Sequence, residues 1–113
     1  MYRPTLLIDL DGVLNQYGKE KYNEFTIPKI KDRAKEFIKK LYSLNKYDLV
    51  LFTTRNMLLA SKWLIKNKLD IYFKDITNTK IPAYLHIDDR AICFQGDYNQ
   101  TFAEIENFKV WWK

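Results

Sequence analysis

The chain has 113 residues and a net charge of +5, and 47% of its residues are hydrophobic. This length fits one domain spanning residues 1–113, and this hydrophobic content can form a core, which argues against intrinsic disorder. The single cysteine, Cys93, excludes an intrachain disulfide and a Cys/His zinc site, and favours a reducing, cytoplasmic location. We expect neither a signal peptide nor a membrane partner, because the apolar run Thr5–Leu10 is short and contains Asp9.

The positive charge is concentrated between Thr26 and Lys46. This segment holds seven basic and two acidic residues, whereas the rest of the chain has twelve of each. A solvated helix face is the simpler interpretation. The functional alternative is a basic surface that attracts a polyanion.

The first half of the chain predicts two strands and two helices. Thr5–Leu10 is typical of a strand buried on both faces, and a loop or small hairpin is expected over Asn15–Phe25. A helix is then predicted to begin at Thr26, with Pro28 in its first turn. The next elements are a strand over Tyr47–Phe52 and a helix capped by Asn56 that runs to about Lys68.

The second half predicts shorter elements. The expected strands are Ile71–Ile76 and Tyr84–Ile87, and Ala91–Phe94 is expected to form an irregular or antiparallel edge. Thr101 and Glu104 match a capping box for a last helix. Its predicted inward stripe is Phe102, Ile105, Phe108 or Lys109, and Trp112. His86 is expected to be a packed core or interface residue rather than a ligand, and Cys93 to be a small buried hydrophobic residue. Trp111 and Trp112 are expected to serve in packing rather than recognition.

This order of elements predicts an α/β fold with a doubly wound, mostly parallel sheet. Only Asn78–Ala83 separates the third and fourth strands, which is shorter than a helical crossover requires. The helix between these strands is therefore predicted to be missing.

Polar clusters follow three of the predicted strands, namely Asp9-Leu10-Asp11-Gly12, Thr53-Thr54-Arg55 and Asp88-Asp89. The carboxyl ends of parallel strands share one edge of a sheet, so four carboxylates should converge there. Such a concentration of negative charge requires a cation, and oxygen ligands beside phosphate favour Mg²⁺. Residues two apart on a strand point the same way, so one aspartate of the first cluster can attack phosphorus while the other handles protons.

These motifs resemble the signatures of the haloacid dehalogenase (HAD) superfamily. Asp9-Leu-Asp11-Gly12 resembles the first signature, and the apolar strand closed by Thr53 resembles the second. Lys80 resembles the lone lysine of the third, and Asp88-Asp89 the paired acids of the fourth. The four occur in the family's order between residues 9 and 89. The resemblance implies a HAD-like Rossmannoid core, and the chain offers no segment for the cap domain that most relatives insert.

The resemblance also implies a role for each residue. Asp9 would form an aspartyl-phosphate, and Asp11 would protonate the leaving group and then activate water. Mg²⁺ would be held by the Asp9 carboxylate, the Asp11 backbone carbonyl and Asp88, with Asp89 as a further ligand. Thr53 and the Thr54 backbone amide would bind the phosphoryl oxygens, and Lys80 would neutralise the phosphate and the nucleophile, so that Thr53 and Lys80 count among the catalytic residues. Gly12 and Arg55 would contact the substrate. Lys74 is a rival for the role of Lys80, because Lys80 is expected on a loop.

The predicted function is thus a phosphomonoester hydrolase whose partner is a phosphorylated small molecule, a nucleotide or a nucleic-acid end. The alternative is a catalytically silent HAD-fold module that binds nucleic acid or protein through its basic helix. A phosphorylation-dependent receiver is disfavoured, because no aspartate ends the second strand. A homo-oligomer in which a neighbouring subunit serves as the cap stays open. The loop aromatics Tyr17, Tyr22 and Phe25 are equally consistent with a cover over the site and with a plain hydrophobic hairpin.

Overall fold

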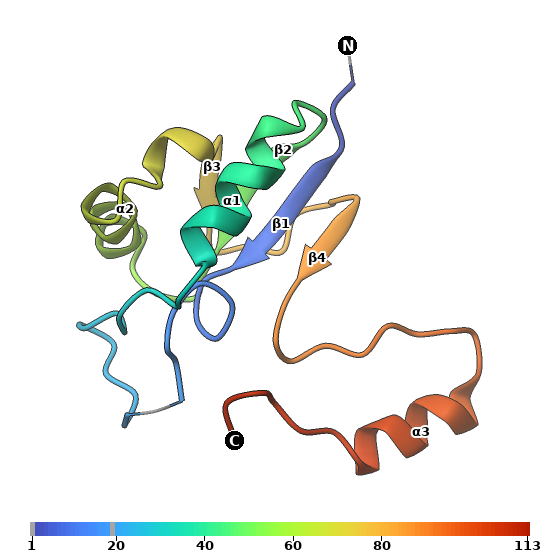
Figure 1. The fold of residues 1–113 in the computed structure, drawn as a ribbon. Helices are drawn as coiled ribbons and strands as arrows, with labels where there is room; N and C mark the ends of the chain where they lie inside the picture. Colours follow the sequence, from blue (N-terminus) through green and yellow to red (C-terminus); the bar gives the residue numbers. More distant parts are fainter. Residues whose placement is uncertain (1, 19) are drawn as a thin grey trace.

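The computed structural model describes residues 2–18 and 20–113 as an α/β fold built on one parallel sheet (Figure 1). The strands lie in the order β3-β2-β1-β4, and every neighbouring pair is parallel. Their bounds are Thr5–Asp9 for β1, Asp48–Phe52 for β2, Asp75–Thr77 for β3 and Leu85–Ile87 for β4. The predicted parallel α/β sheet is confirmed, and so is the absence of a helix between β3 and β4 among these residues.

Two helices cover one face of this sheet, α1 (Ala34–Ser43) and α2 (Met57–Lys66). Leu6 and Ile8 of β1 lie opposite Leu49 and Leu51 of β2, and all four belong to one buried core with residues of both helices. A short 3₁₀ turn, Asp70–Tyr72, and a third helix, α3 (Tyr98–Glu106), complete the described elements. No helix of the described residues is long and apolar enough to cross a membrane.

Helix α3 does not form the second layer of a doubly wound sheet, so this part of the prediction is wrong. Phe102 and Ile105, expected to face inward, are 65% and 59% exposed, and α3 buries none of its residues. Figure 1 shows the reason, since the segment after β4 carries α3 away from the sheet. The radius of gyration is 15.0 Å, above the roughly 13 Å typical of a compact chain of this length.

Helix α1 begins eight residues later than predicted, at Ala34 rather than Thr26. The cause is a backbone pairing of residues 29–31 with residues 14–16, which the helical spacing of the apolar residues after Thr26 does not indicate. Asn15 and Ile30 form an antiparallel bridge, the Gln16 amide donates to the Lys29 carbonyl, and the Lys31 amide donates to the Leu14 carbonyl. Residues 15–18 and 20–30 therefore form a hairpin-like flap, which extends past the loop or small hairpin predicted over Asn15–Phe25 into the segment predicted as helix.

Helix α2 begins as predicted, because the Asn56 side chain accepts a hydrogen bond from the Leu59 amide at 3.1 Å. The cap of α3 is different from the prediction. Asp97, rather than Thr101, accepts hydrogen bonds from the first amides of the helix, and so α3 starts at Tyr98. An aspartate is as good a cap as a threonine, and it comes earlier in the chain.

The burial expected for Cys93, and a core position for His86, are wrong, because both residues are exposed. Ala91–Phe94 is irregular, as one of the two predicted alternatives had it. The strand β4 pairs with β1 alone, so it is an edge of the sheet. With α3 turned away, the edge and the segment that follows it have no covering layer.

Candidate functional site

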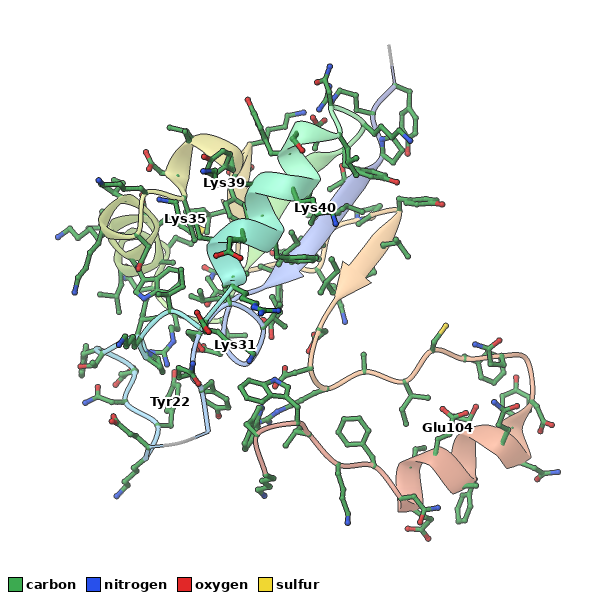
Figure 2. The ribbon with its side chains drawn as sticks, viewed as in Figure 1. Tyr22, Lys31, Lys35, Lys39, Lys40 and Glu104 are labelled. Atoms are coloured by element: carbon green, nitrogen blue, oxygen red, sulfur yellow. The ribbon has the colours of Figure 1, made fainter. Side chains whose placement is uncertain are left out.

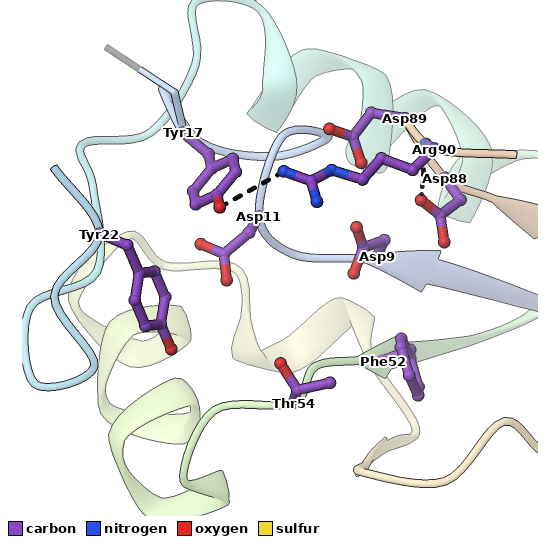
Figure 3. A pocket seen from close by; sticks show the side chains of 9 residues that line it. All are labelled: Asp9, Asp11, Tyr17, Tyr22, Phe52, Thr54, Asp88, Asp89 and Arg90. Carbon is purple, nitrogen blue, oxygen red and sulfur yellow. Dashed lines mark hydrogen bonds between the residues drawn. The ribbon is translucent and has the colours of Figure 1, made fainter. Parts of the chain in front are cut away.

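The carboxyl ends of the strands form a pocket of about 390 Å³. Asp9 is the last residue of β1 and lies opposite Phe52, the last residue of β2. The pair Asp88-Asp89 follows β4 directly. Figure 3 shows the lining residues, which are Asp9, Asp11, Tyr17, Tyr22, Phe52, Thr54, Asp88, Asp89 and Arg90. The sheet thus brings the predicted acids together from two separate parts of the chain, the ends of β1 and β4.

Three of these acids form a group that could hold a metal ion, namely Asp9, Asp88 and Asp89. One carboxylate oxygen from each residue lies within 4.8 Å of those from the other two. All three donors are carboxylates, which suit a hard cation such as Mg²⁺ or Ca²⁺. The side chain of Asp11 lines the pocket but does not belong to this trio.

The trio makes an ionised Asp9 costly. Burial, followed by the charges of Asp88, Asp89 and Asp11, raises the pKa of Asp9 from its ordinary value of 3.8 to about 8. A cation bound among these carboxylates would offset the repulsion and favour the ionised form of Asp9.

Asp11 is held by two partners on the other side of the pocket. Arg55 Nε donates to its Oδ2 at 2.8 Å, and Asn15 Nδ2 donates to its Oδ1 at 3.0 Å. A carboxylate has about four acceptor positions, so each oxygen retains one beyond these contacts. The Asp11 side chain is therefore fixed in orientation, with an acceptor position still available on each oxygen.

Arg55 lies behind Asp11 rather than in the lining of this pocket. Arg55 is only 3% exposed, and its Nη1 donates to the Asn23 carbonyl at 2.8 Å. The guanidinium also lies over the Tyr22 ring, with 4.8 Å to the ring centroid. Predicted as a substrate contact, Arg55 here ties the flap to Asp11 and to the end of β2.

The two threonines after β2 have different surroundings. Thr54 is exposed and lines the pocket, whereas Thr53 is 1% exposed and lies outside the lining. Thr53 Oγ1 accepts from the Arg55 amide at 3.1 Å, and its hydroxyl keeps its own donor. Asn78 Nδ2 donates to the carbonyls of Thr53 and Arg55, which fixes the turn after β2 to the segment after β3.

Gly12 is required by a close approach. Its φ is +84°, and a Cβ placed there would overlap the carboxylate of Asp89. Its amide donates to Asn15 Oδ1 at 3.1 Å, and its carbonyl accepts from Trp111 Nε1. Gly12, predicted as a substrate-binding residue, has both backbone polar groups bonded within the protein, and it lets Asp89 pack against the turn.

The C-terminal segment, residues 107–113, contacts this site directly. Trp112 Nε1 donates to Asp89 Oδ2 at 2.6 Å. The Trp112 ring meets the Tyr17 ring edge-on, with 5.1 Å between centroids, and fills the space beside Gly18 that a Cβ would need. The two tryptophans were expected to serve in packing rather than recognition, and nothing in the sequence links residue 112 to residue 89. Their indole N–H groups also donate hydrogen bonds, Trp112 to the Asp89 carboxylate and Trp111 to the Gly12 carbonyl.

Family models, curated proteins and solved structures were all compared with this chain, and none matches. The resemblance to the HAD superfamily therefore rests on the sequence motifs. The chemistry of the site rests on its own geometry.

The two candidate lysines lie at opposite ends of the parallel strands, Lys74 at the amino ends and Lys80 at the carboxyl ends. Lys74 precedes β3, and its Nζ pairs with Asp48 Oδ2 at 3.3 Å, at the amino end of β2. Lys80 follows the carboxyl end of β3 by three residues, on the edge that carries the acids. Lys80 is exposed and does not line the pocket. Chain direction therefore favours Lys80, and its side chain would have to turn toward Asp9 to contact a bound phosphate.

Arg90, Asn15 and Asn78 were not predicted as site residues. Asn15 is fully buried, and the spacing of an Asn three residues after a glycine is a recognisable turn signal. A basic residue directly after paired acids, as in Arg90, is a weaker signal for a residue that lines this pocket.

Proposed function

We propose that this protein is a Mg²⁺-dependent phosphomonoester hydrolase of the HAD type, with Asp9 as the nucleophile. The observation that carries the proposal is the group of Asp9, Asp88 and Asp89 in one pocket with Asp11. The strand order β3-β2-β1-β4, with the pocket at the carboxyl edge, is compatible with a Rossmann-like core.

The donor set fits Mg²⁺ in chemistry and in charge. Asp9, Asp88 and Asp89 would hold the ion, and the raised pKa of Asp9 marks a cluster that needs positive charge. A bound Mg²⁺ would neutralise the phosphoryl oxygens and orient the ester for attack.

The protein's own residues would carry the two chemical steps. In the first, an Asp9 carboxylate oxygen bonds to phosphorus, the phosphorus–oxygen bond to the leaving group breaks, and Asp11 gives that oxygen a proton. In the second, Asp11 takes a proton from water, whose oxygen attacks the aspartyl-phosphate. The phosphorus bond to Asp9 then breaks, so inorganic phosphate leaves and Asp9 is restored.

The contacts of Asp11 suit this second role. Arg55 and Asn15 hold the carboxylate from behind, so that it faces the pocket in one orientation. Thr54 lies across the pocket from Asp11, where its hydroxyl and backbone amide would meet the phosphoryl oxygens (Figure 3).

A screen for phosphate release tests the proposal. With Mg²⁺ present, the protein should release phosphate from an aryl phosphate and from at least one of three groups: sugar phosphates, nucleotides and phosphate-ended oligonucleotides. The silent-module alternative predicts no release above that of Asp9→Asn on any of them, together with saturable binding of an oligonucleotide.

The positions of the two lysines make a separate prediction. Lys80→Ala should lower kcat/KM for an aryl phosphate by about 10²- to 10³-fold, the usual cost of losing one donor to transition-state charge. Lys74→Ala should leave it within about twofold, because that lysine pairs with Asp48 at the far edge of the sheet. Loss of this exposed ion pair should cost only about 0–1 kcal/mol of stability. A larger kinetic effect of Lys74→Ala would move the catalytic role to that residue.

A further inference from the structure

A second pocket of about 570 Å³ adjoins the acidic one, and Arg90 lines both. The C-terminal segment provides the rest of its lining, namely Phe108, Lys109, Val110, Trp112 and Lys113. Trp112, which lines the second pocket, donates a hydrogen bond to Asp89, which lines the acidic pocket. The two pockets therefore meet at this pair of side chains.

Arg90 is oriented before any ligand arrives. Its guanidinium lies over two rings, at 5.5 Å from the centroid of Tyr17 and 5.1 Å from that of Trp112. Its Nη2 also donates to the Tyr17 hydroxyl at 3.4 Å (Figure 3). Within the described residues Arg90 forms no ion pair with a carboxylate. An oriented guanidinium whose donors are not taken up by a carboxylate is well suited to bind a phosphate.

The charges of the two pockets are opposite. The first is lined by four aspartates, which favour a metal ion and the phosphate bound to it. The second has three basic side chains, Arg90, Lys109 and Lys113, and no acid within its described lining. A ligand that spans both pockets would place one phosphate at Asp9 and a second anion at Arg90.

The basic helix is less well placed for this role. Figure 2 shows Lys35, Lys39 and Lys40 spread along α1. The helix leads away from the flap toward Asp48, at the amino edge of the sheet, so its later lysines lie far from Asp9. Lys31, before the helix, already lies over the Trp111 ring at 4.4 Å from its centroid.

We propose that the substrate carries a second phosphate group, which binds Arg90 at the junction of the two pockets while the cleaved phosphate lies at Asp9. This inference rests on the proposed phosphatase function. The second phosphate can be another monoester, as in a sugar bisphosphate, or the neighbouring phosphodiester of a nucleic-acid end. Both present the same oxygens to a guanidinium.

The test compares substrates with one and two phosphates. One pair is a nucleoside 5′-monophosphate and the matching 5′-phosphorylated dinucleotide, and the other is a hexose 6-phosphate and the hexose 1,6-bisphosphate. The ratio of kcat/KM for the two-phosphate over the one-phosphate substrate should exceed one in at least one pair. Arg90→Gln should lower that ratio about 10- to 100-fold, mainly through KM, as expected for a lost charged hydrogen bond. The pair that responds identifies the source of the second phosphate.

Lys39→Gln is the matched control, since it removes one positive charge from α1 without touching either pocket. It should leave the ratio unchanged. An equal loss on one- and two-phosphate substrates in Arg90→Gln would place Arg90 at the cleaved phosphate and overturn the inference. An equal fall of the ratio in Lys39→Gln would overturn it too, because the effect would then be general charge attraction. If the wild-type protein hydrolyses none of these substrates, nor an aryl phosphate, the proposed function itself fails.

Discussion

Asp9→Asn should abolish phosphate release, lowering kcat by about 10³-fold or more. An amide cannot form the acyl-phosphate that a carboxylate forms, and loss of a covalent nucleophile has effects of this size or larger. Rapid acid quench of the wild-type protein with a ³²P-labelled aryl phosphate should trap label on Asp9, and the variant should trap none. Label on another residue, or normal turnover by the variant, would contradict the assignment.

The same substitution should stabilise the metal-free fold at alkaline pH. Burial and three neighbouring carboxylates raise the pKa of Asp9 to about 8, so its ionised form is disfavoured in the folded state. Asn carries no charge at any pH. At pH 8 and above the gain should be on the order of 1–3 kcal/mol after solvent screening, measured by urea unfolding in chelator. Asp32→Asn changes an exposed acid in the same way and should alter neither turnover nor stability.

The parts of the fold that the sequence predicts well are those with local causes. The strands β1 and β2 are continuous apolar runs, and Asn56 is a cap that contacts its own helix. The convergence of Asp9 with Asp88 and Asp89 also follows from a simple rule, since parallel strands share a carboxyl edge. Each of these predictions can be made without knowing which residues far apart in the sequence contact one another.

The start of α1 shows where this reasoning fails. The segment from Thr26 to Arg33 has helical periodicity, but residues 29–31 pair with residues 14–16 across the flap. Arg33 then takes a left-handed conformation, with φ of 70°, directly before the helix. Long-range backbone pairing overrides local propensity here, and a single sequence carries no signal for it.

The tail contacts could not be predicted for a similar reason. Trp112 reaches Asp89, and Trp111 reaches Gly12 across 99 residues of chain. Packing was the reasonable expectation for adjacent tryptophans at the end of an amphipathic helix. Trp112 does pack, against the Tyr17 ring. Its contact with the site arises because α3 turns away from the sheet and only residues 107–113 return to it. Site residues that lie on a segment returning to the site after a long irregular connection can be identified only from the structure.

Removal of divalent metal should reduce phosphate release to the level of Asp9→Asn. Without a cation the Asp9, Asp88 and Asp89 carboxylates repel both one another and the incoming phosphate dianion. Dialysis against EDTA, followed by addition of Mg²⁺, should restore activity saturably. Ca²⁺ should bind in competition but support less turnover, because it accepts looser geometry and more ligands. Undiminished turnover in excess chelator would disprove the metal requirement.

Metal binding should also reverse the effect of pH on stability. In chelator, the folded protein keeps a proton on Asp9 that the unfolded chain loses above about its ordinary pKa of 3.8. The folded state therefore binds more protons between pH 4 and pH 8, so Asp9 makes its stability fall across this window and level off above it. Mg²⁺ is expected to bind the ionised form of Asp9, so its stabilising effect should grow with pH over the same range.

At ten times its Kd near pH 8, Mg²⁺ should add about 1.4 kcal/mol to the free energy of unfolding and raise Tm by roughly 5 °C or more. Asp9→Asn should lose the chelator-state pH slope and most of the Mg²⁺ shift together, whereas Asp32→Asn should keep both. A Mg²⁺ shift of equal size at pH 5 and pH 8 would show that the ion binds elsewhere on the protein.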